Sequence, residues 1–177
     1  AAACLRITLA TLVPDLIFAE TGLDTLRFHL RGTSKVAAGL HELLATSCVG
    51  VALADGPGDP SPTLLGPERI RPVGFEREEA ALPWPQRAFD GHRLLTEYFA
   101  HPEKFLYIEL SGIEARSLLQ RSNKLEVFIY LGRAAPDDIP RDGQAFRARH
   151  EPDLDLARAA VKHDQLDQVV DERRMRI

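Results

Sequence analysis

The side chains that could bind a metal ion occur singly along this chain. Residues 41–45 read His-Glu-Leu-Leu-Ala, which begins like the helical H-E-x-x-H signature of zinc proteases. Ala45 stands where the second histidine is required, and two ligands on one helix face are what make such a site bind zinc. The six histidines and two cysteines show no other paired spacing typical of zinc sites. We therefore expect His41 to be a surface or hydrogen-bonded helix residue, and we predict no metal site and no cofactor.

Phosphate binding and nucleophilic catalysis have equally weak support. Residues 32–35, Gly-Thr-Ser-Lys, follow a predicted strand and precede a predicted helix, but they lack the Gly-Lys-Ser/Thr order of a P-loop. Helix capping by Thr33 or Ser34 accounts for them. Cys48 lies between Ser47 and an apolar run, a setting that raises the pKa of a thiol and makes it a poor nucleophile.

The remaining acid–base candidates are three glutamates in one loop, Glu76, Glu78 and Glu79. Paired carboxylates hydrolyse glycosides when they are fixed across a cleft, whereas neighbouring acids in a loop are usually solvated. We predict no catalytic residue. A hydrolase that uses these acids with a histidine is the third of three hypotheses.

Composition narrows the class of protein. The chain has 177 residues and a formal net charge of −4, which gives no reason to expect nucleic acid as a partner. Hydrophobic residues at 45% and charged residues at 27% are typical of a folded globular chain. The apolar runs are far shorter than the roughly 20 residues of a membrane-spanning helix, so no direct membrane insertion is expected. Cys4 and Cys48 lie in apolar surroundings that suit free buried thiols, which favours a reduced, cytoplasmic protein.

The first half of the chain predicts strands and one helix. Apolar residues alternate over residues 5–9 and 26–30, the pattern of half-buried strands. Apolar residues at helical spacing follow Thr33 and Ser34 and predict a helix over 33–44. An apolar, β-rich run over 48–54 predicts a further strand, and the Gly- and Pro-rich residues 55–62 predict a surface loop.

The second half alternates in the same way. Residues 68–75 predict a strand that Pro72 places at an edge or a bulge. An ordered loop over 80–89 leads to an amphipathic helix that Asp90 would cap and that ends before Pro102. The two clearest strands cover residues 104–110 and 124–131. The element order predicts an α+β fold, mainly antiparallel β with short inserted helices.

Charge and aromatic content divide the chain in two. Residues 134–177 contain 10 acidic and 8 basic residues, and eleven of the twelve aromatic residues precede them. We therefore predict a β-rich domain over residues 1–133 and a charged tail over 134–177, with spacing compatible with a helix over 153–172. The chain opens inside a predicted strand and its one methionine is Met175, which suggests an excerpt of a longer protein.

Aromatic, proline and charged residues are dense between residues 69 and 105. Trp, Tyr and Arg are enriched at interface hot spots, although spacing alone does not separate interface residues from core residues. In this interpretation residues 71–75 and 93–105 form a rigid platform, against which Trp84 pins the intervening loop. The candidates for the interface or its platform are Arg71, Phe75, Trp84, Arg93, Glu97, Tyr98, Phe99, Glu103, Lys104 and Phe105.

The same segments carry a resemblance to a known family. Leu-Arg-Phe-His-Leu-Arg-Gly at 26–32, Arg-Pro-Val-Gly-Phe at 71–75, Leu-Pro-Trp-Pro at 82–85 and the run at 93–105 closely resemble TssF proteins, also called VasA or ImpG. TssF is the baseplate wedge subunit of bacterial type VI secretion systems. The resemblance covers roughly residues 4–133, after which the sequence departs from the family pattern.

The resemblance implies a non-enzymatic, structural subunit of the cytoplasmic baseplate at the inner face of the bacterial inner membrane. The partners it implies are the second wedge subunit TssG, the subunits TssK and TssE, and a second copy of the chain, which together support contractile tail assembly and effector delivery. The alternative hypothesis is an isolated β-rich carbohydrate-binding module that uses Trp84 and Tyr98 as stacking surfaces.

Overall fold

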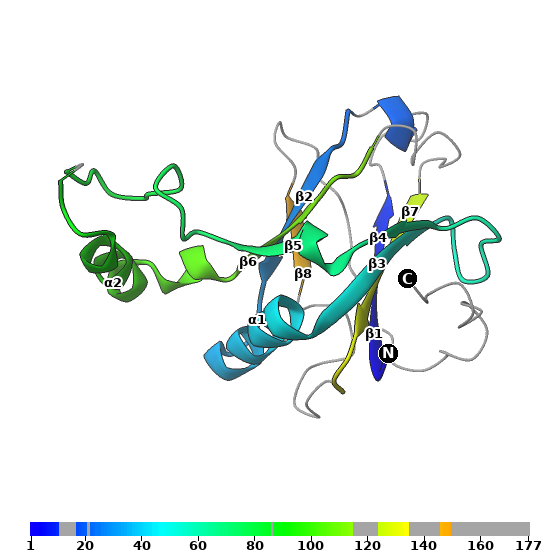
Figure 1. Cartoon of the computed structure of the whole chain (residues 1–177), viewed down its shortest axis with the longest axis horizontal. Coiled ribbons are helices and arrows are strands. Elements are labelled where there is room, and N and C mark those ends of the chain that lie inside the picture. Colours follow the sequence, from blue (N-terminus) through cyan, green and yellow to red (C-terminus); the bar gives the residue numbers. More distant parts are fainter. Residues whose placement is uncertain (11–16, 21, 86, 115–123, 135–145, 150–177) are drawn as a thin grey trace.

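Two four-stranded antiparallel sheets form the body of the protein in the computed structural model (Figure 1). The structure describes residues 1–10, 17–20, 22–85, 87–114 and 124–134, and the backbone of residues 146–149. The first sheet has the order β1 (Ala3–Ala10), β7 (Lys124–Leu131), β3 (Cys48–Ala54), β4 (Thr63–Leu65). The second has the order β5 (Ile70–Val73), β6 (Tyr107–Ser111), β2 (Thr25–Leu30), β8 (Phe146–Arg149). This arrangement confirms the predicted α+β class, mainly antiparallel β.

The core lies between the two sheets. In β1 every second residue is buried, including Leu5, Ile7 and Leu9, as its alternating sequence predicts. Phe28 of β2 and Leu110 of β6 belong to the same apolar cluster, so both sheets contribute to a single core. Burial of these faces is the main force that holds the sheets together.

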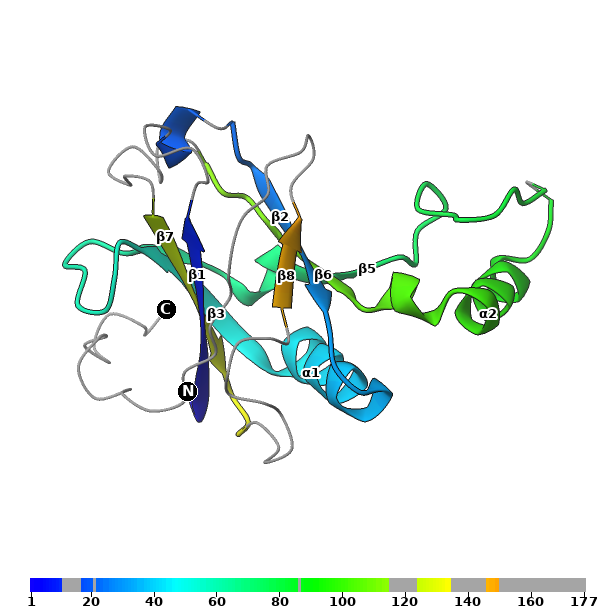
Figure 2. The ribbon, with the colours of Figure 1, turned by 180° about the vertical axis from the view of Figure 1, so that it is seen from behind.

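Helix α1 (Ser34–Ser47) contacts strands of both sheets (Figure 2). Thr33 is its N-cap, and the Thr33 Oγ1 accepts a hydrogen bond from the Val36 N–H at 3.4 Å. The face with Leu40, Leu43 and Leu44 is buried in the core. The predicted cap and helical face are confirmed.

The first sheet is also buried on its outer face. Ala52, Ala54, Phe128 and Tyr130 form a second apolar cluster there, with the half-buried Cys4 packed against them. Strand β7 is therefore buried on both faces from Leu125 to Leu131, which explains its nearly continuous apolar sequence.

Two predicted strands are shorter than expected. The segment 68–75 contains a 3-10 helix, η2 (Pro67–Arg69), followed by β5, and Pro72 lies on an edge strand as predicted. The segment 104–110 begins in another 3-10 helix, η3 (Pro102–Phe105), in which Lys104 N–H binds the His101 carbonyl. In both cases a proline at the first turn favours the helical start over the strand. A third 3-10 helix, η1 (Phe18–Glu20), precedes β2.

Strand β8 comes from the segment predicted as a separate tail. It pairs with β2 in the register Arg27 to Arg149 and Leu30 to Phe146. Part of the segment 134–177 therefore belongs to the second sheet. The helix predicted over 153–172 lies outside the described residues, and the domain boundary at residue 133 stays a prediction.

The connection between β5 and β6 projects from the body as an arm, which we define as residues 74–106 (Figures 1 and 2). It leaves and re-enters the sheet at one point, because Val73 and Tyr107 are paired in the β5–β6 ladder. The arm carries helix α2 (Asp90–Ala100) and η3. The prediction that Asp90 caps α2 is wrong: Phe89 occupies the N-cap without a side-chain hydrogen bond, and Asp90 lies in the first turn.

Within the described residues, the helices are too short and too polar to cross a membrane.

Candidate protein-interaction site

Helix α2 has its polar and apolar faces reversed. Its buried side chains are Arg93 and Glu97, which are 2% and 0% exposed. Leu95, Tyr98 and Phe99 are 58%, 56% and 81% exposed. An amphipathic helix on a protein surface normally buries its apolar face, whereas α2 buries its charged one. Buried charges are costly unless they are paired, so Arg93 and Glu97 need partners inside the arm.

Glu97 lies at the centre of the arm and accepts hydrogen bonds from three segments. Its Oε1 accepts from the backbone N–H groups of Ala81 at 2.9 Å and Leu82 at 3.3 Å. Its Oε2 accepts from Arg93 Nη1 at 3.1 Å and from Lys104 Nζ. Burial raises the pKa of Glu97, but the Lys104 ammonium and the two backbone donors outweigh it, so the pKa lies below its ordinary value.

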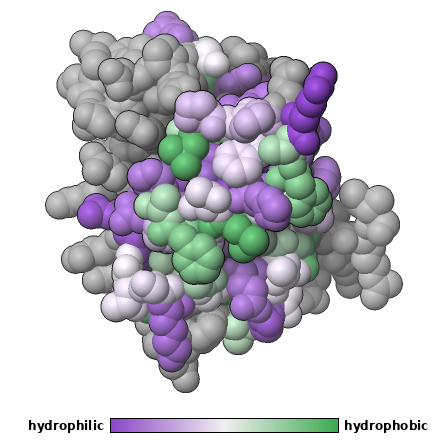
Figure 3. Space-filling view, turned by 90° about the vertical axis from the view of Figure 1, so that its left-hand side faces the viewer, coloured by the Kyte–Doolittle hydropathy of each residue, from purple (hydrophilic) through white to green (hydrophobic). Residues whose placement is uncertain are grey.

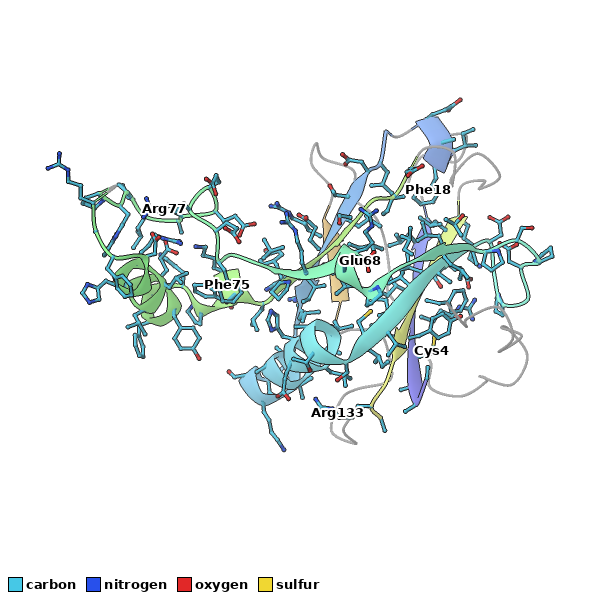
Figure 4. The ribbon with its side chains drawn as sticks, in the orientation of Figure 1. Cys4, Phe18, Glu68, Phe75, Arg77 and Arg133 are labelled. Atoms are coloured by element: carbon cyan, nitrogen blue, oxygen red, sulfur yellow. The ribbon has the colours of Figure 1, made fainter. Side chains whose placement is uncertain are left out.

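Arg93 connects this network to the start of the arm. Its Nη2 donates to the Phe75 carbonyl oxygen at 2.9 Å, and its Nε lies 3.9 Å from Asp90 Oδ1. Asp90 in turn accepts a hydrogen bond from Arg77 at 2.9 Å. Arg77 and Phe75 both lie in the arm (Figure 4). One ion pair and three hydrogen bonds to backbone groups thus bind α2 to both loop segments that precede it.

A second buried carboxylate joins three strands of the sheet at the base of the arm. Glu109 of β6 is 3% exposed and lies directly opposite Arg27 of β2 and Arg71 of β5. Each arginine Nε donates to one Glu109 oxygen at 2.7 Å. Burial raises the pKa of Glu109, but the two guanidinium groups outweigh this effect, so the pKa lies below its ordinary value.

The first turn of the arm depends on Gly74. Its φ is +106°, in the region that side chains rarely adopt, and a Cβ there would lie 2.7 Å from the Lys104 carbonyl oxygen. The Gly74 N–H donates to Glu79 Oε2 at 2.7 Å. The outgoing and returning backbones of the arm therefore pass in close contact at this glycine.

Aromatic rings form a ridge along one side of the arm. Phe75 and Phe105 have ring centroids 5.1 Å apart, Phe105 and Tyr98 6.0 Å, and Tyr98 and Phe99 5.7 Å. Phe105 is 7% exposed, whereas Phe75 is 43% exposed and Phe99 is exposed over most of its surface. We call Phe75, Leu95, Tyr98, Phe99 and Phe105 the aromatic ridge. Figure 3 views this end of the molecule and shows apolar side chains at the surface among polar ones.

The structure divides nine of the ten predicted interface residues into a buried and an exposed group, and Trp84 is intermediate. Arg93, Glu97 and Phe105 are buried inside the arm, and Lys104, with 13% of its side chain exposed, joins them. Phe75, Tyr98, Phe99 and Glu103 are exposed, and Arg71 is exposed but bound to Glu109. Trp84 is half-buried, and its Nε1 is enclosed without a hydrogen-bond partner among the described residues.

Two exposed residues and one buried residue were not predicted. Phe89 is 73% exposed and Leu95 is 58% exposed, and neither is among the ten predicted interface residues. Glu109 lies in the strand predicted over 104–110, and the sequence predicts no role for it. The spacing of Arg93 and Glu97, four residues apart, was the available signal for an ion pair inside α2.

The three loop glutamates do not converge on a cleft. Glu76 and Glu78 are exposed, and Glu79 accepts hydrogen bonds from the Gly74 and Glu76 N–H groups. This arrangement lacks the facing carboxylates that glycoside hydrolysis requires. Trp84 and Tyr98, the proposed sugar-stacking pair, form no ring contact with each other in the described part of the chain.

The other reactive side chains are inert in their surroundings. Burial raises the pKa of the Cys4 thiol to about 11 and also raises that of Cys48, as predicted for Cys48. Both cysteines are free and half-buried. His41 corrects a prediction: its Nε2 is enclosed without a hydrogen-bond partner among the described residues, and burial lowers its pKa. The described residues contain no cluster of three or more metal-ligating side chains.

Comparison with known proteins places this fold in a family. The family model described as "Type VI secretion system, TssF" matches residues 1–154, so the similarity extends beyond residue 133. The type VI secretion system component TssF1 of Pseudomonas aeruginosa is 35% identical over 117 residues, which are 66% of this chain and 19% of that protein.

A solved structure supports the fold. It is the cryo-electron microscopy structure of the type VI secretion system TssK-TssF-TssG baseplate subcomplex. The match has a TM-score of 0.63 and 22% identity, and it covers 89% of this chain and 31% of the matched chain. The chain thus spans about a fifth of its curated relative and about a third of the solved chain. With the family model matching most of its length, the chain belongs to the TssF family of the type VI secretion system.

Proposed function

We propose that this chain is a structural part of a type VI secretion baseplate and acts by binding other baseplate subunits, without catalysis. The observation that carries the proposal is the family match over residues 1–154. The geometry agrees with it, because the arm places ordered apolar side chains on the surface while Arg93 and Glu97 of α2 are paired inside it.

We propose TssG and TssK as the direct partners, since the similar solved structure is a subcomplex of TssK, TssF and TssG. Contacts with TssE and with a second copy of the chain belong to the same proposal. Its site of action is the cytoplasmic baseplate, at the inner face of the inner membrane, where it supports assembly of the contractile tail and effector delivery.

The arm supplies the binding platform in this proposal. Arg71, Arg93, Glu97, Lys104 and Phe105 hold the platform in shape, and Trp84 holds the loop before α2. The exposed side chains that would contact a partner are Phe75, Tyr98, Phe99 and Glu103.

Co-purification tests this function. The chain is co-expressed with TssG and TssK of the same bacterium, purified through a tag on the chain, and analysed by size-exclusion chromatography with light scattering. A stoichiometric complex is expected. A folded acidic protein of similar net charge, expressed in the same way, controls for non-specific electrostatic binding. A chain that is folded by circular dichroism but elutes alone would contradict the proposal.

A further inference from the structure

The exposed apolar side chains of this protein are concentrated on the arm. Eight large hydrophobic residues are exposed in the described part of the chain, and five of them lie between residues 75 and 99. Leu95, Tyr98 and Phe99 follow one another at i, i+3 and i+4 along α2. Contiguous apolar surface of this kind marks an interaction site, and this spacing is that of a helix that lies in an apolar groove.

The exposed face of α2 carries no free charge. The charged residues of the helix are Asp90, Arg93 and Glu97, and each is bound within the arm. The exposed side chains of the helix are His92, Leu95, Thr96, Tyr98, Phe99 and Ala100, and none of them is an acid, a lysine or an arginine. A surface that complements this face must itself be apolar at its centre, because a charge buried against it would lose its hydration without gaining a partner.

The border of the aromatic ridge is acidic. Glu76 adjoins Phe75 in the chain, Glu78 follows in the same loop, and Glu103 lies in η3 beside Phe105. All three side chains are exposed and form no ion pair among the described residues. Among the described lysines and arginines of the arm, Arg87 alone is likewise exposed and without an ion pair. An acidic border repels a second acidic border, and it also repels an anionic lipid surface. It attracts a surface whose border is basic.

We propose that α2 binds, through the aromatic ridge, in an apolar groove on a different protein chain, and that basic side chains border that groove. The inference rests on the proposed function, since the groove belongs to a partner subunit of the baseplate. Leu95, Tyr98 and Phe99 are the anchors, and Glu76 and Glu103 pair with the basic border.

The anchors are tested with the subunits TssG and TssK of the same bacterium as the probe. Affinity for the TssK–TssG pair is measured by biolayer interferometry for wild type, Leu95→Ser and Phe99→Ser. Leu64→Ser is the matched control, because Leu64 is a 47% exposed leucine on β4, away from the arm. Loss of about tenfold or more in affinity is expected for the arm variants and no change for the control. Unchanged circular dichroism and urea midpoints verify that the variants are folded.

The acidic border is tested by charge reversal. Glu103→Lys and Glu76→Lys are expected to slow association severalfold, most strongly at low salt, whereas Glu20→Lys makes the same change of charge on exposed η1 and leaves the rate unchanged.

Four outcomes would overturn the inference. If wild type binds and the arm variants bind equally well, the inference is wrong and the proposed function stands. If folded wild type does not bind, both are wrong. A concentration-dependent dimer of the chain alone that Phe99→Ser dissociates would assign the ridge to a second copy. Binding to phosphatidylserine vesicles that Phe99→Ser abolishes would assign it to a lipid surface.

Discussion

Arg93 and Glu97 lie one helical turn apart on α2, with Arg93 Nη1 3.1 Å from Glu97 Oε2, and both are buried. Two ionised side chains are costly to bury unless their hydrogen-bonding capacity is used. Most of it is used here by partners outside the helix, namely the Ala81 and Leu82 N–H groups, the Phe75 carbonyl and Lys104, whereas Arg93 Nε is buried without a hydrogen-bond partner among the described residues. A polar interior of this kind leaves the apolar residues of α2 for the surface.

Removal of the Glu97 carboxylate is expected to open the arm. Glu97→Ala leaves Lys104 without a counter-charge and Arg93 with Asp90 at 3.9 Å as its remaining ion-pair partner among the described residues, and breaking such a buried pair costs about 3–5 kcal/mol in comparable sites. Native-state hydrogen exchange then reports faster exchange at Ala81 and Leu82, by about a hundredfold or more, with little change at core amides of β7. Glu103→Ala, which removes an exposed glutamate of the same arm, is the control and changes little. Equal exchange rates in both variants would exclude this role for Glu97.

Stability is expected to fall on acidification through the carboxyl range. The pKa values of Glu97 and Glu109 are lowered in the folded protein, so the unfolded chain binds their protons first. Their contribution is complete above the unfolded pKa of about 4.3 and is lost as the pH falls through the folded pKa. Urea unfolding between neutral and acidic pH measures the effect. Glu97→Gln should flatten this pH dependence, and a slope identical to that of wild type would contradict the assignment.

Gly74 is expected to tolerate no side chain. Gly74→Ala combines a φ of +106° with a Cβ 2.7 Å from the Lys104 carbonyl, so the free energy of unfolding should fall by more than about 1 kcal/mol. Gly39→Ala is the matched control, since Gly39 lies inside α1 and a Cβ there meets nothing within 4 Å. That variant should be more stable by about 0.5–1 kcal/mol. Chemical denaturation of the two variants gives the comparison, and equal effects would refute the close approach at Gly74.

Both thiols are expected to react slowly in the folded protein. Burial raises the pKa of Cys4 to about 11 and raises that of Cys48, so little thiolate exists at mildly alkaline pH. Ellman's reagent should label both cysteines much faster after unfolding in urea than before it. Rapid labelling of Cys4 in the folded state would show that its environment is more open than the structure indicates.

Local sequence pattern determined most individual elements. Alternation predicted β1 and β2, helical spacing and Thr33 predicted α1, and a nearly continuous apolar run predicted β7. These features depend on near neighbours in the chain, which is why periodicity and capping reveal them. The chemistry of proline likewise placed Pro72 on an edge strand.

The tertiary structure decided which face of α2 is buried. Periodicity identifies the residues that share a helix face, and the apolar face is normally the buried one. In the arm the partners of Glu97 come from 15 and 16 residues earlier and 7 residues later, and Glu109 binds arginines 82 and 38 residues away. Only folding brings these donors to the two carboxylates. The pattern of the sequence therefore did not predict which charges are buried or which residues of the aromatic ridge are exposed, and the tertiary structure determines both.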